Sequence, residues 1–253
     1  MSLEAHILAS GSDGNCVVVE ADDTFIMIDA GLSGRKITAL MSKAGLDPKR
    51  IDAILLTHEH SDHVQGAGVL SRKHDIPIHA NRYTYMNSRL GNVFGKEIFQ
   101  TMKPFSIGPV TVRPLPTLHN AVEPNAFAFQ FNGTRMLLAT DTGKVTDPVM
   151  EELGVVDLAI IESNYDNEML VRGDYPVFLK RLIKSDSGHL SNVDCAAALK
   201  RTAREGRRVF LAHLSKNNNT PEIAKETVSC GTGCNAGDLD CLECQGDVRS
   251  ISL

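Results

Sequence analysis

The sequence THEHSDH, residues 57–63, follows directly on the apolar run IDAILL and is the most informative segment of the chain. In an extended backbone alternate side chains point the same way, so His58 and His60 would face one point. Asp62 and His63 enter the next predicted helix and would turn toward a neighbouring point. Imidazole and carboxylate groups bind zinc, and two neighbouring clusters of such ligands suit a pair of divalent ions. The segment therefore predicts a two-metal site at the end of a buried strand.

The spacing distinguishes this site from that of the zinc proteases. Their helical pattern, His-Glu-x-x-His, would need a histidine where this chain has Asp62. A chance cluster of surface histidines is the alternative. Four ligand-type side chains directly after a buried strand argue against it.

Short apolar stretches rich in β-branched residues surround this segment and are separated by Gly, Ser, Asn and Asp. Strands are predicted at residues 4–10, 16–21, 24–30, 51–57, 76–80, 110–115, 126–131, 134–140, 157–163 and 207–214. Helices are predicted at residues 34–46, 64–74, 191–206 and 220–228. Strands in two runs, each followed by helices, predict an α/β fold of two mixed sheets packed face to face with helices outside.

The composition is that of an ordinary folded protein. The 253 residues are 42% hydrophobic and 23% charged, and we expect one main domain over residues 1–228. No apolar stretch approaches about 18 residues and the N-terminus has no basic segment before an apolar run, so we expect a cytoplasmic protein with no membrane partner. A net charge of −5 argues against a protein that coats nucleic acid, but it allows a local basic groove.

The pattern His-x-His-x-Asp-His after an apolar strand resembles the signature of the metallo-β-lactamase superfamily, whose fold is an αββα sandwich. The metal ligands that this resemblance implies are His58, His60, Asp62, His63, His119, Asp141 and His213. Asp141 in LLATDTG would bridge the two metals, and Asp29 in FIMIDAG would steady the histidine loop. A lone histidine or aspartate after a strand is usually structural, so the ordered recurrence of these residues carries the assignment.

A narrower resemblance, over roughly residues 4–226, is to the WalJ/YycJ branch, which is associated with 5′→3′ DNA exonuclease activity. It is carried by LASGSDGN, HEHSDHVQGAG, ATDTG, ESNYD, SDSGHLSN and LAHLSKNNNTPEIA. It implies a DNA phosphodiesterase with two divalent ions, zinc or alternatively manganese, in which Asp62 orients a hydroxide that bridges them. Asn120 and Tyr165 stand where aspartate and histidine are usual in the branch, and these departures bear on substrate preference.

His189 in SDSGHLSN is a second candidate for the last metal ligand, besides the histidine in VFLAHLS. Ser191 and Asn192, at the start of a predicted helix, would offer polar and backbone N–H groups to an anion. In related phosphodiesterases a histidine upstream of the last ligand contacts the phosphoryl group, so the resemblance gives His189 that catalytic role. Capping of its own helix is the alternative. Arg35 and Lys36 are candidate contacts to backbone phosphates.

Four of the six cysteines, Cys230, Cys234, Cys241 and Cys244, lie in residues 229–253, beyond the part that resembles the family. Disulfides are disfavoured in a cytosolic chain, and four thiolates suit a tetrahedral structural zinc. We therefore predict a cysteine-rich tail with its own zinc. Disulfides and an iron–sulfur cluster are the alternatives.

The predicted metal ligands are also compatible with two other functions. The same metal centre activates water for attack on a carbonyl, so an acyl hydrolase, a thioesterase or β-lactamase, is the main alternative to the nuclease. A binding module with structural metals is less well supported, because structural zinc sites are closed sets of four ligands. Basic residues at the rim of the site would favour the nuclease, and an apolar pocket would favour the acyl hydrolase.

Overall fold

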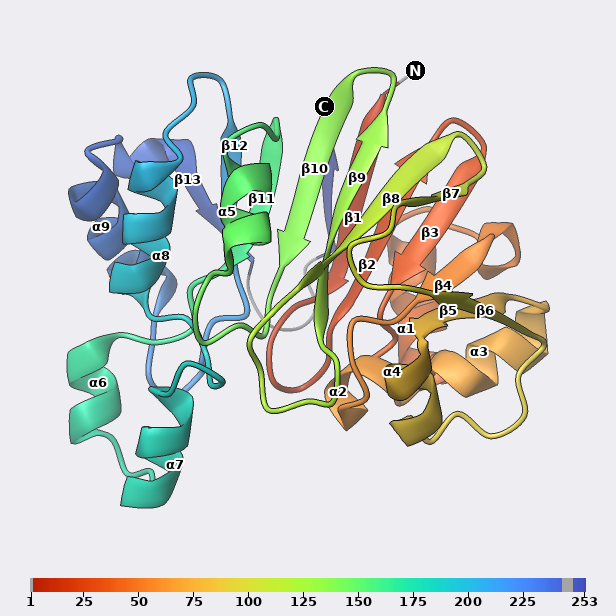
Figure 1. Cartoon of the computed structure of the whole chain (residues 1–253), viewed down its shortest axis with the longest axis horizontal. Helices are drawn as coiled ribbons and strands as arrows, with labels where there is room; N and C mark the ends of the chain where they lie inside the picture. The colour runs from red at the N-terminus through yellow and green to blue at the C-terminus, as the bar shows by residue number, and fades with distance from the viewer. Residues whose placement is uncertain (1, 243–247) are drawn as a thin grey trace.

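Two β-sheets face each other across an apolar core in the computed structural model, which describes residues 2–242 and 248–253 (Figure 1). Within these residues each sheet has seven strands and contains both parallel and antiparallel pairs. The first sheet has the strand order β14-β1-β2-β3-β4-β5-β6, and the second has the order β13-β12-β11-β10-β9-β8-β7. The predicted fold class, two mixed sheets packed face to face, is confirmed.

Most strands of the first sheet precede those of the second along the chain. The first sheet contains β1 (Leu3–Ala9), β2 (Cys16–Ala21), β3 (Thr24–Ile28), β4 (Ala53–Leu55), β5 (Pro77–Asn81), β6 (Gly95–Phe99) and β14 (Arg249–Ser252). The second contains β7 (Phe105–Ile107), β8 (Val110–Pro116), β9 (Asn125–Phe131), β10 (Thr134–Ala139), β11 (Leu158–Glu162), β12 (Arg208–Ala212) and β13 (Leu239–Cys241). The chain thus completes nearly all of one sheet before it starts the other, and it returns to the first sheet only at its C-terminal end.

Alternating side chains of the inner strand faces fill the space between the sheets. Leu3, Ala5 and Ile7 of β1 belong to this core, together with Phe127 and Phe129 of β9. The hairpin between β9 and β10 turns at Asn132 and Gly133, which both have positive φ angles, 47° and 85°. Two positive φ angles in a two-residue turn match the twist of the flanking strands, which fixes their register.

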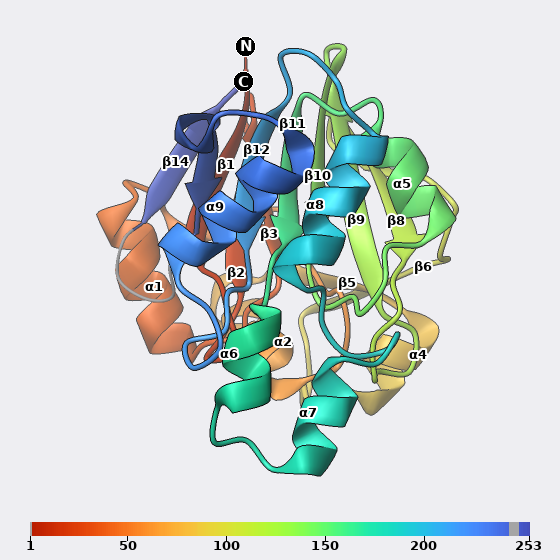
Figure 2. The same ribbon diagram turned by 90° about the vertical axis from the view of Figure 1, so that its left-hand side faces the viewer.

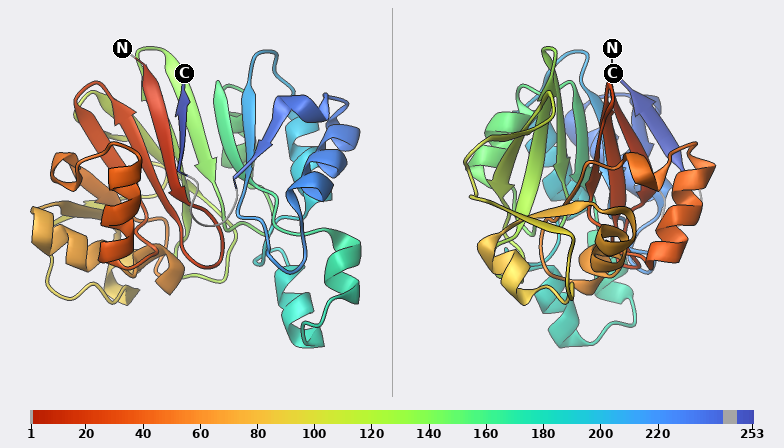
Figure 3. Two further views of the ribbon diagram at one scale, coloured as in Figure 1. Left: turned by 180° about the vertical axis from the view of Figure 1, so that it is seen from behind. Right: turned by 90° about the vertical axis from the view of Figure 1, so that its right-hand side faces the viewer.

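Helices cover the outer face of each sheet (Figure 2). The first sheet is covered by α1 (Gly34–Lys43), α2 (Ser61–Val64), α3 (Ala67–His74) and α4 (Arg82–Asn87), and the second by α5 (Asp147–Leu153), α8 (Asn192–Arg201) and α9 (Pro221–Thr232). Two more helices, α6 (Asn167–Arg172) and α7 (Val177–Ile183), project beyond one end of the sandwich (Figure 3). None of the helices in the described part of the chain has the length and apolar character that crossing a membrane requires.

The strand directions bring several loops to one end of the sandwich. β3 and β4 are parallel, and so are β10, β11 and β12. The carboxyl ends of parallel strands lie at the same edge of a sheet, so the loops that follow these strands meet there. β8 also ends at this edge, because it is antiparallel to β9 and β9 is antiparallel to β10. The projecting helices α6 and α7 lie at this same end (Figure 1).

The predicted helix over residues 64–74 is divided into α2 and α3 at Gly66. A Cβ atom at this position would lie 2.4 Å from the carbonyl oxygen of Leu32, so the backbone approaches another loop more closely than any other residue would allow. Periodicity of apolar side chains does not reveal such a contact. The short elements α4, α6, α7, β6 and β7 also lack a clear periodic pattern and were not predicted.

The described part of the cysteine-rich tail belongs to the sandwich, which corrects the expected domain boundary. Residue 228 lies inside α9, which continues to Thr232. β13 pairs with β12 in the second sheet, and β14 pairs with β1 in the first. Cys244 lies outside the described residues. Leu242 and Ile251 contribute to the central core, so burial of apolar side chains holds this segment against both sheets.

Candidate metal centre

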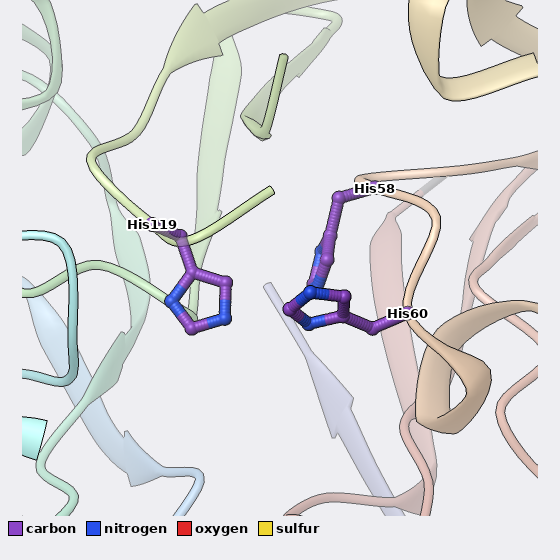
Figure 4. A group of neighbouring side chains, drawn as sticks. All are labelled: His58, His60 and His119. Carbon is purple, nitrogen blue, oxygen red and sulfur yellow. The ribbon is translucent and has the colours of Figure 1, made fainter. Parts of the chain in front are cut away.

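Three histidines from two loops point toward one another (Figure 4). His58 and His60 follow β4, and His119 follows β8. The ring centroids of His58 and His60 are 4.6 Å apart, and that of His119 lies 5.3 Å from His58 and 5.1 Å from His60. Each ring offers a nitrogen within 4.8 Å of the others, which is close enough for all three to bind one ion.

A second group faces the first across Asp141. Asp62, His63 and His213 bring ligand atoms within 4.8 Å of one another. One carboxylate oxygen of Asp141 lies 3.6 Å from Nε2 of His213 and 3.7 Å from Nε2 of His119. The other oxygen lies 3.3 Å from Nε2 of His63. Asp141 is therefore placed between the two groups, where one carboxylate can contact an ion in each.

Three residues of the centre adopt left-handed backbone conformations. Asp29, Asp141 and His213 directly follow or closely follow β3, β10 and β12, and their φ angles are 57°, 56° and 56°. Positive φ is uncommon outside glycine and costs on the order of 1 kcal/mol or more, so it persists where the surrounding structure requires it. At each of these strand ends the turn directs a polar side chain into the centre.

Asp29 holds the loop of residues 57–63 in place through its carboxylate. Its carboxylate accepts hydrogen bonds from the backbone N–H of Thr57 at 2.9 Å and from the Thr57 hydroxyl at 2.8 Å. It also lies 2.7 Å from Nδ1 of His63. This contact fixes the proton on Nδ1 and turns Nε2 of His63 toward Asp141.

The protonation states of His58, His119 and Asp141 suit metal binding. Burial, together with the neighbouring His63, holds the pKa of His58 well below its usual range, and burial lowers the pKa of His119. Burial alone would raise the pKa of Asp141, but His213 and His63 hold it well below its usual range. Neutral imidazole and ionised carboxylate are the forms that bind divalent ions.

Two buried ring nitrogens without hydrogen-bond partners also indicate a metal site. Within the described residues, Nε2 of His58 and Nε2 of His213 have no hydrogen-bond partner. A buried polar atom without a partner is costly, and metal coordination would satisfy both nitrogens. The residues present therefore fit a pair of divalent ions.

The centre opens into a cavity of about 230 Å³. The cavity is lined by Ser12, His60, Asp62, His119, Asn120, Asp141, Leu179, Leu182, Ile183, Gly188, His189 and His213. Its wall is therefore polar on the side of the ligand loops and apolar on the side of α7.

Comparison with known proteins identifies the family of the chain. Residues 24–214 match the β-lactamase superfamily domain. The chain belongs to the metallo-β-lactamase branch of this superfamily. The crystal structure of the metallo-β-lactamase fold protein YhfI from Bacillus subtilis superimposes with a TM-score of 0.74 at 17% identity, covering 99% of this chain and 100% of that one. This similarity shows that the fold is shared.

Two curated relatives are more similar in sequence. Exodeoxyribonuclease YycJ from Bacillus anthracis is 41% identical over 234 residues, which cover 90% of this chain and 89% of the relative. Exodeoxyribonuclease WalJ from Streptococcus pneumoniae is 42% identical over 229 residues, which cover 88% of this chain and 85% of the relative. The resemblance to the WalJ/YycJ branch of the metallo-β-lactamase superfamily is therefore confirmed.

Glu162 is a residue of this metallo-β-lactamase site that the sequence analysis missed. Its carboxylate lies 2.7 Å from Nδ1 of His189 and 3.0 Å from Nδ1 of His213. Its other oxygen accepts a hydrogen bond from the backbone N–H of Thr142 at 2.8 Å. Glu162 thus orients both imidazoles with Nε2 away from itself. The signal in the sequence was its position at the end of the apolar strand LAIIE, because the other site residues also stand at the ends of strands.

His189 lies beside the second group, and the structure brings it close to His213. The two ring centroids are 5.3 Å apart, and Nδ1 of His189 is 3.9 Å from Asp141. Burial alone would lower the pKa of His189, but the Glu162 carboxylate raises it to about 9. A protonated imidazole at the cavity wall suits contact with an anion.

Four residues predicted to bind substrate lie elsewhere or are engaged internally. Arg35 and Lys36 are exposed in the first turn of α1 and are not among the residues that line the cavity. Ser191 is buried and caps α8 by accepting a hydrogen bond from the backbone N–H of Asp194. Asn192 is buried as well. This assigns Ser191 and Asn192 to support of the site in place of the predicted substrate contact.

The buried amide of Asn192 connects several loops. Its carbonyl oxygen accepts hydrogen bonds from the Ser163 hydroxyl at 2.7 Å and from the side-chain amide of Asn219 at 2.9 Å.

Asn120 and Tyr165 are the two residues that depart from the usual pattern of the branch, and they lie in different places. Asn120 lines the metal cavity. Tyr165 lies in a separate pocket beside Lys184 and Arg201.

The loops that hold the ligands approach each other closely at Gly31. The backbone N–H of Asn15 donates to the carbonyl of Asp62 at 2.8 Å, and that of Gly31 donates to the carbonyl of Asn15 at 2.8 Å. A Cβ atom at residue 31 would lie 1.6 Å from the Asp62 carbonyl oxygen. We expect Gly31→Ala to lower the free energy of unfolding by about 1–3 kcal/mol and to reduce bound metal, because the Asp62 loop must move. Denaturant titration and elemental analysis measure the two effects.

Gly154→Ala is the matched control for this prediction. A Cβ atom at residue 154 would lie 3.4 Å from its nearest neighbour, the Glu151 carbonyl oxygen, which is an ordinary contact distance. Equal stability and equal metal content in the two variants would show that the close approach at Gly31 does not hold the site together.

Proposed function

We propose that the chain is an exodeoxyribonuclease that hydrolyses phosphodiester bonds at a centre with two divalent metal ions. The position of Asp141 between the two ligand groups carries this proposal, because one bridging carboxylate with three further ligands on each side is the arrangement that a two-ion centre needs. The 41% and 42% identities to relatives named exodeoxyribonucleases support DNA as the substrate. The sequence motifs that resemble the WalJ/YycJ branch imply 5′→3′ polarity, and we propose that direction for this chain.

The proposed ligands of the first ion are His58, His60 and His119, and those of the second are Asp62, His63 and His213, with Asp141 shared. The imidazole-rich sets favour zinc, with manganese as the alternative. When bound, two such ions polarise a phosphoryl oxygen and make a water molecule acidic enough to attack near neutral pH.

The residues of the chain perform the other tasks of the reaction. Asp62 lines the cavity with a partly exposed carboxylate, and we assign it the orientation of the attacking water. His189 faces the same cavity with its Nδ1 held by Glu162. We assign His189 the stabilisation of charge on the phosphoryl group and proton donation to the leaving oxygen.

A substrate panel tests this proposal. Metal-loaded protein is given single-stranded and duplex DNA labelled at the 5′ or 3′ end, RNA, bis-p-nitrophenyl phosphate and a thioester. We expect mononucleotides to be released from the 5′ end of DNA and little turnover of the thioester. Thioester hydrolysis with no release of nucleotides would instead assign the centre to an acyl hydrolase.

A zinc in the cysteine-rich tail stays a prediction. Cys230 lies in α9 and Cys234 follows it, and both thiols are exposed, whereas Cys241 is buried in β13. We expect native mass spectrometry to show one zinc fewer in Cys230→Ser/Cys234→Ser than in the wild type, because two of four thiolates would be lost. Equal metal content would refute a zinc held by these cysteines. A mass four protons lighter without extra metal would indicate two disulfides.

A further inference from the structure

The helix α7 presents an apolar and basic face to solvent beside the metal cavity. Phe178 is 73% exposed, the highest value among the large exposed hydrophobic residues of the described chain, and Leu182 is 41% exposed. Residues four apart lie on the same face of a helix, so these two side chains are neighbours. The helix projects from the end of the sandwich that holds the ligand loops (Figure 2).

Other side chains of α7 hold the helix in place. Ile183 and Leu179 pack with Leu170 of α6 and with Tyr165. Lys180 donates hydrogen bonds from Nζ to the carbonyl oxygens of residues 171 and 173, at 2.8 Å and 2.6 Å. These contacts fix the orientation of the helix, so Phe178 and Leu182 are held outward.

The exposed face is continuous with the metal cavity. Leu182 lines the cavity together with His189 and Asp62. Phe178 lies one helical turn from Leu182, on the side away from the cavity. Phe178 is therefore about 6 Å along the helix axis, four residues at about 1.5 Å each, from a side chain that lines the cavity.

Positive charge accompanies this face. Arg181 lies three residues after Phe178 and Lys184 caps the end of α7, and both are exposed. No hydrogen bond or ion pair joins either side chain to another group within residues 2–242 and 248–253. An apolar surface beside free cations is complementary to a strand that offers bases and phosphates alternately.

We propose that Phe178 is a stacking platform for an unpaired base next to the scissile phosphate, and that Arg181 contacts the phosphate beside that base. The proposal rests on the proposed nuclease function and narrows its substrate to an unpaired strand end. Paired bases inside a duplex are stacked on one another and present no free face to Phe178.

Equilibrium binding tests the proposal independently of turnover. The probe is a fluorescein-labelled, phosphorothioate-linked single-stranded oligonucleotide, and fluorescence anisotropy gives its Kd for the metal-loaded protein. We expect Phe178→Ala to raise Kd about tenfold, which corresponds to about 1.4 kcal/mol and is within the range of base–aromatic stacking. Phe178→Trp should bind about as tightly as the wild type, because it keeps an aromatic face.

Two controls separate stacking from other effects. Phe94→Ala removes another exposed phenylalanine, 61% exposed and located before β6, and should leave Kd unchanged. An oligonucleotide that lacks bases at its terminal nucleotides should bind Phe178→Ala and the wild type with about equal affinity. An equal loss of affinity for the abasic strand, or an equal loss in Phe94→Ala, would overturn the proposal.

The same variants distinguish a second copy of the chain as the occupant of this face. Light scattering should give the same molar mass for the wild type and Phe178→Ala. A wild-type dimer that dissociates in Phe178→Ala would assign the face to self-association and overturn the stacking proposal. If the wild type binds DNA in the predicted pattern but hydrolyses none of it, the nuclease function fails while the stacking site stands.

Discussion

Replacing Asp141 by asparagine is expected to release metal from both positions and to lower turnover by about a thousandfold or more. Asp141 lies within 3.7 Å of nitrogen atoms of His63, His119 and His213, so its carboxylate is placed to reach both ligand groups. Two ions together contribute several kcal/mol to stabilisation of the transition state, and each 1.4 kcal/mol is a factor of about ten in rate. Asparagine has nearly the same shape and tolerates the positive φ angle of residue 141, so the change removes chiefly the negative charge.

Elemental analysis of purified protein measures this effect directly. We expect close to two equivalents of metal in the wild type and far less than one in Asp141→Asn. Asp147→Asn makes the same chemical change at the exposed start of α5 and should keep both metals and full turnover. Retention of two equivalents in Asp141→Asn would show that this carboxylate does not bridge the ions.

Replacing His189 by alanine is expected to reduce turnover by about a hundredfold or more while the metals stay bound. His189 lines the cavity, and its Nδ1 is occupied by Glu162 at 2.7 Å, so its Nε2 is the nitrogen available to the substrate. Loss of a group that donates a proton or stabilises developing charge costs about 10²–10⁴ in rate. His213→Ala should behave differently, because His213 is the proposed ligand and bound metal should fall.

The metal contents of His189→Ala and His213→Ala show which of the two histidines is a metal ligand. Metal loss in His189→Ala with retention in His213→Ala would exchange their roles. Glu162→Gln adds a further measurement, since it keeps the size of the side chain but weakens the support of both rings. We expect Glu162→Gln to lower turnover less than His189→Ala does.

The histidine loop was predictable because its ligands are neighbours in the chain. His58, His60, Asp62 and His63 lie within six residues after a strand, and the geometry of that strand end fixes their directions. His119, Asp141 and His213 are single residues after separate strands, and periodicity alone does not distinguish them from turn residues. Their order along the chain matched a known family, and that match is what selected them.

The residues that support the site were harder to predict, because their partners are distant in sequence. Glu162 contacts His189 and His213, which follow it by 27 and 51 residues. Ser191 and Asn192 looked available to a substrate at the start of a helix, but the fold buries both. Burial and pairing of a polar side chain depend on which loops meet, and one strand or helix does not contain that information.

The structure of the cysteine-rich tail was also hard to predict from its sequence. Its cysteines drew attention to metal binding, whereas the apolar side chains of Leu239, Leu242 and Ile251 place its described part against the two sheets. β13 and β14 are short, three and four residues, and each is stable only as an added edge strand. Short edge strands carry little periodicity of their own.

By itself, the sequence determined the fold class, the two runs of strands and the cluster of ligands around residues 57–63. These features depend on local patterns: alternation of apolar residues, turn residues between them and ligands spaced for one strand end. The tertiary structure decided the pairing of Glu162 with two histidines, the close approach at Gly31, the inclusion of the tail in both sheets and the outward face of α7. Each of these depends on contacts between segments far apart in the chain, and such contacts are set by packing of the whole sandwich rather than by the residues of any one segment.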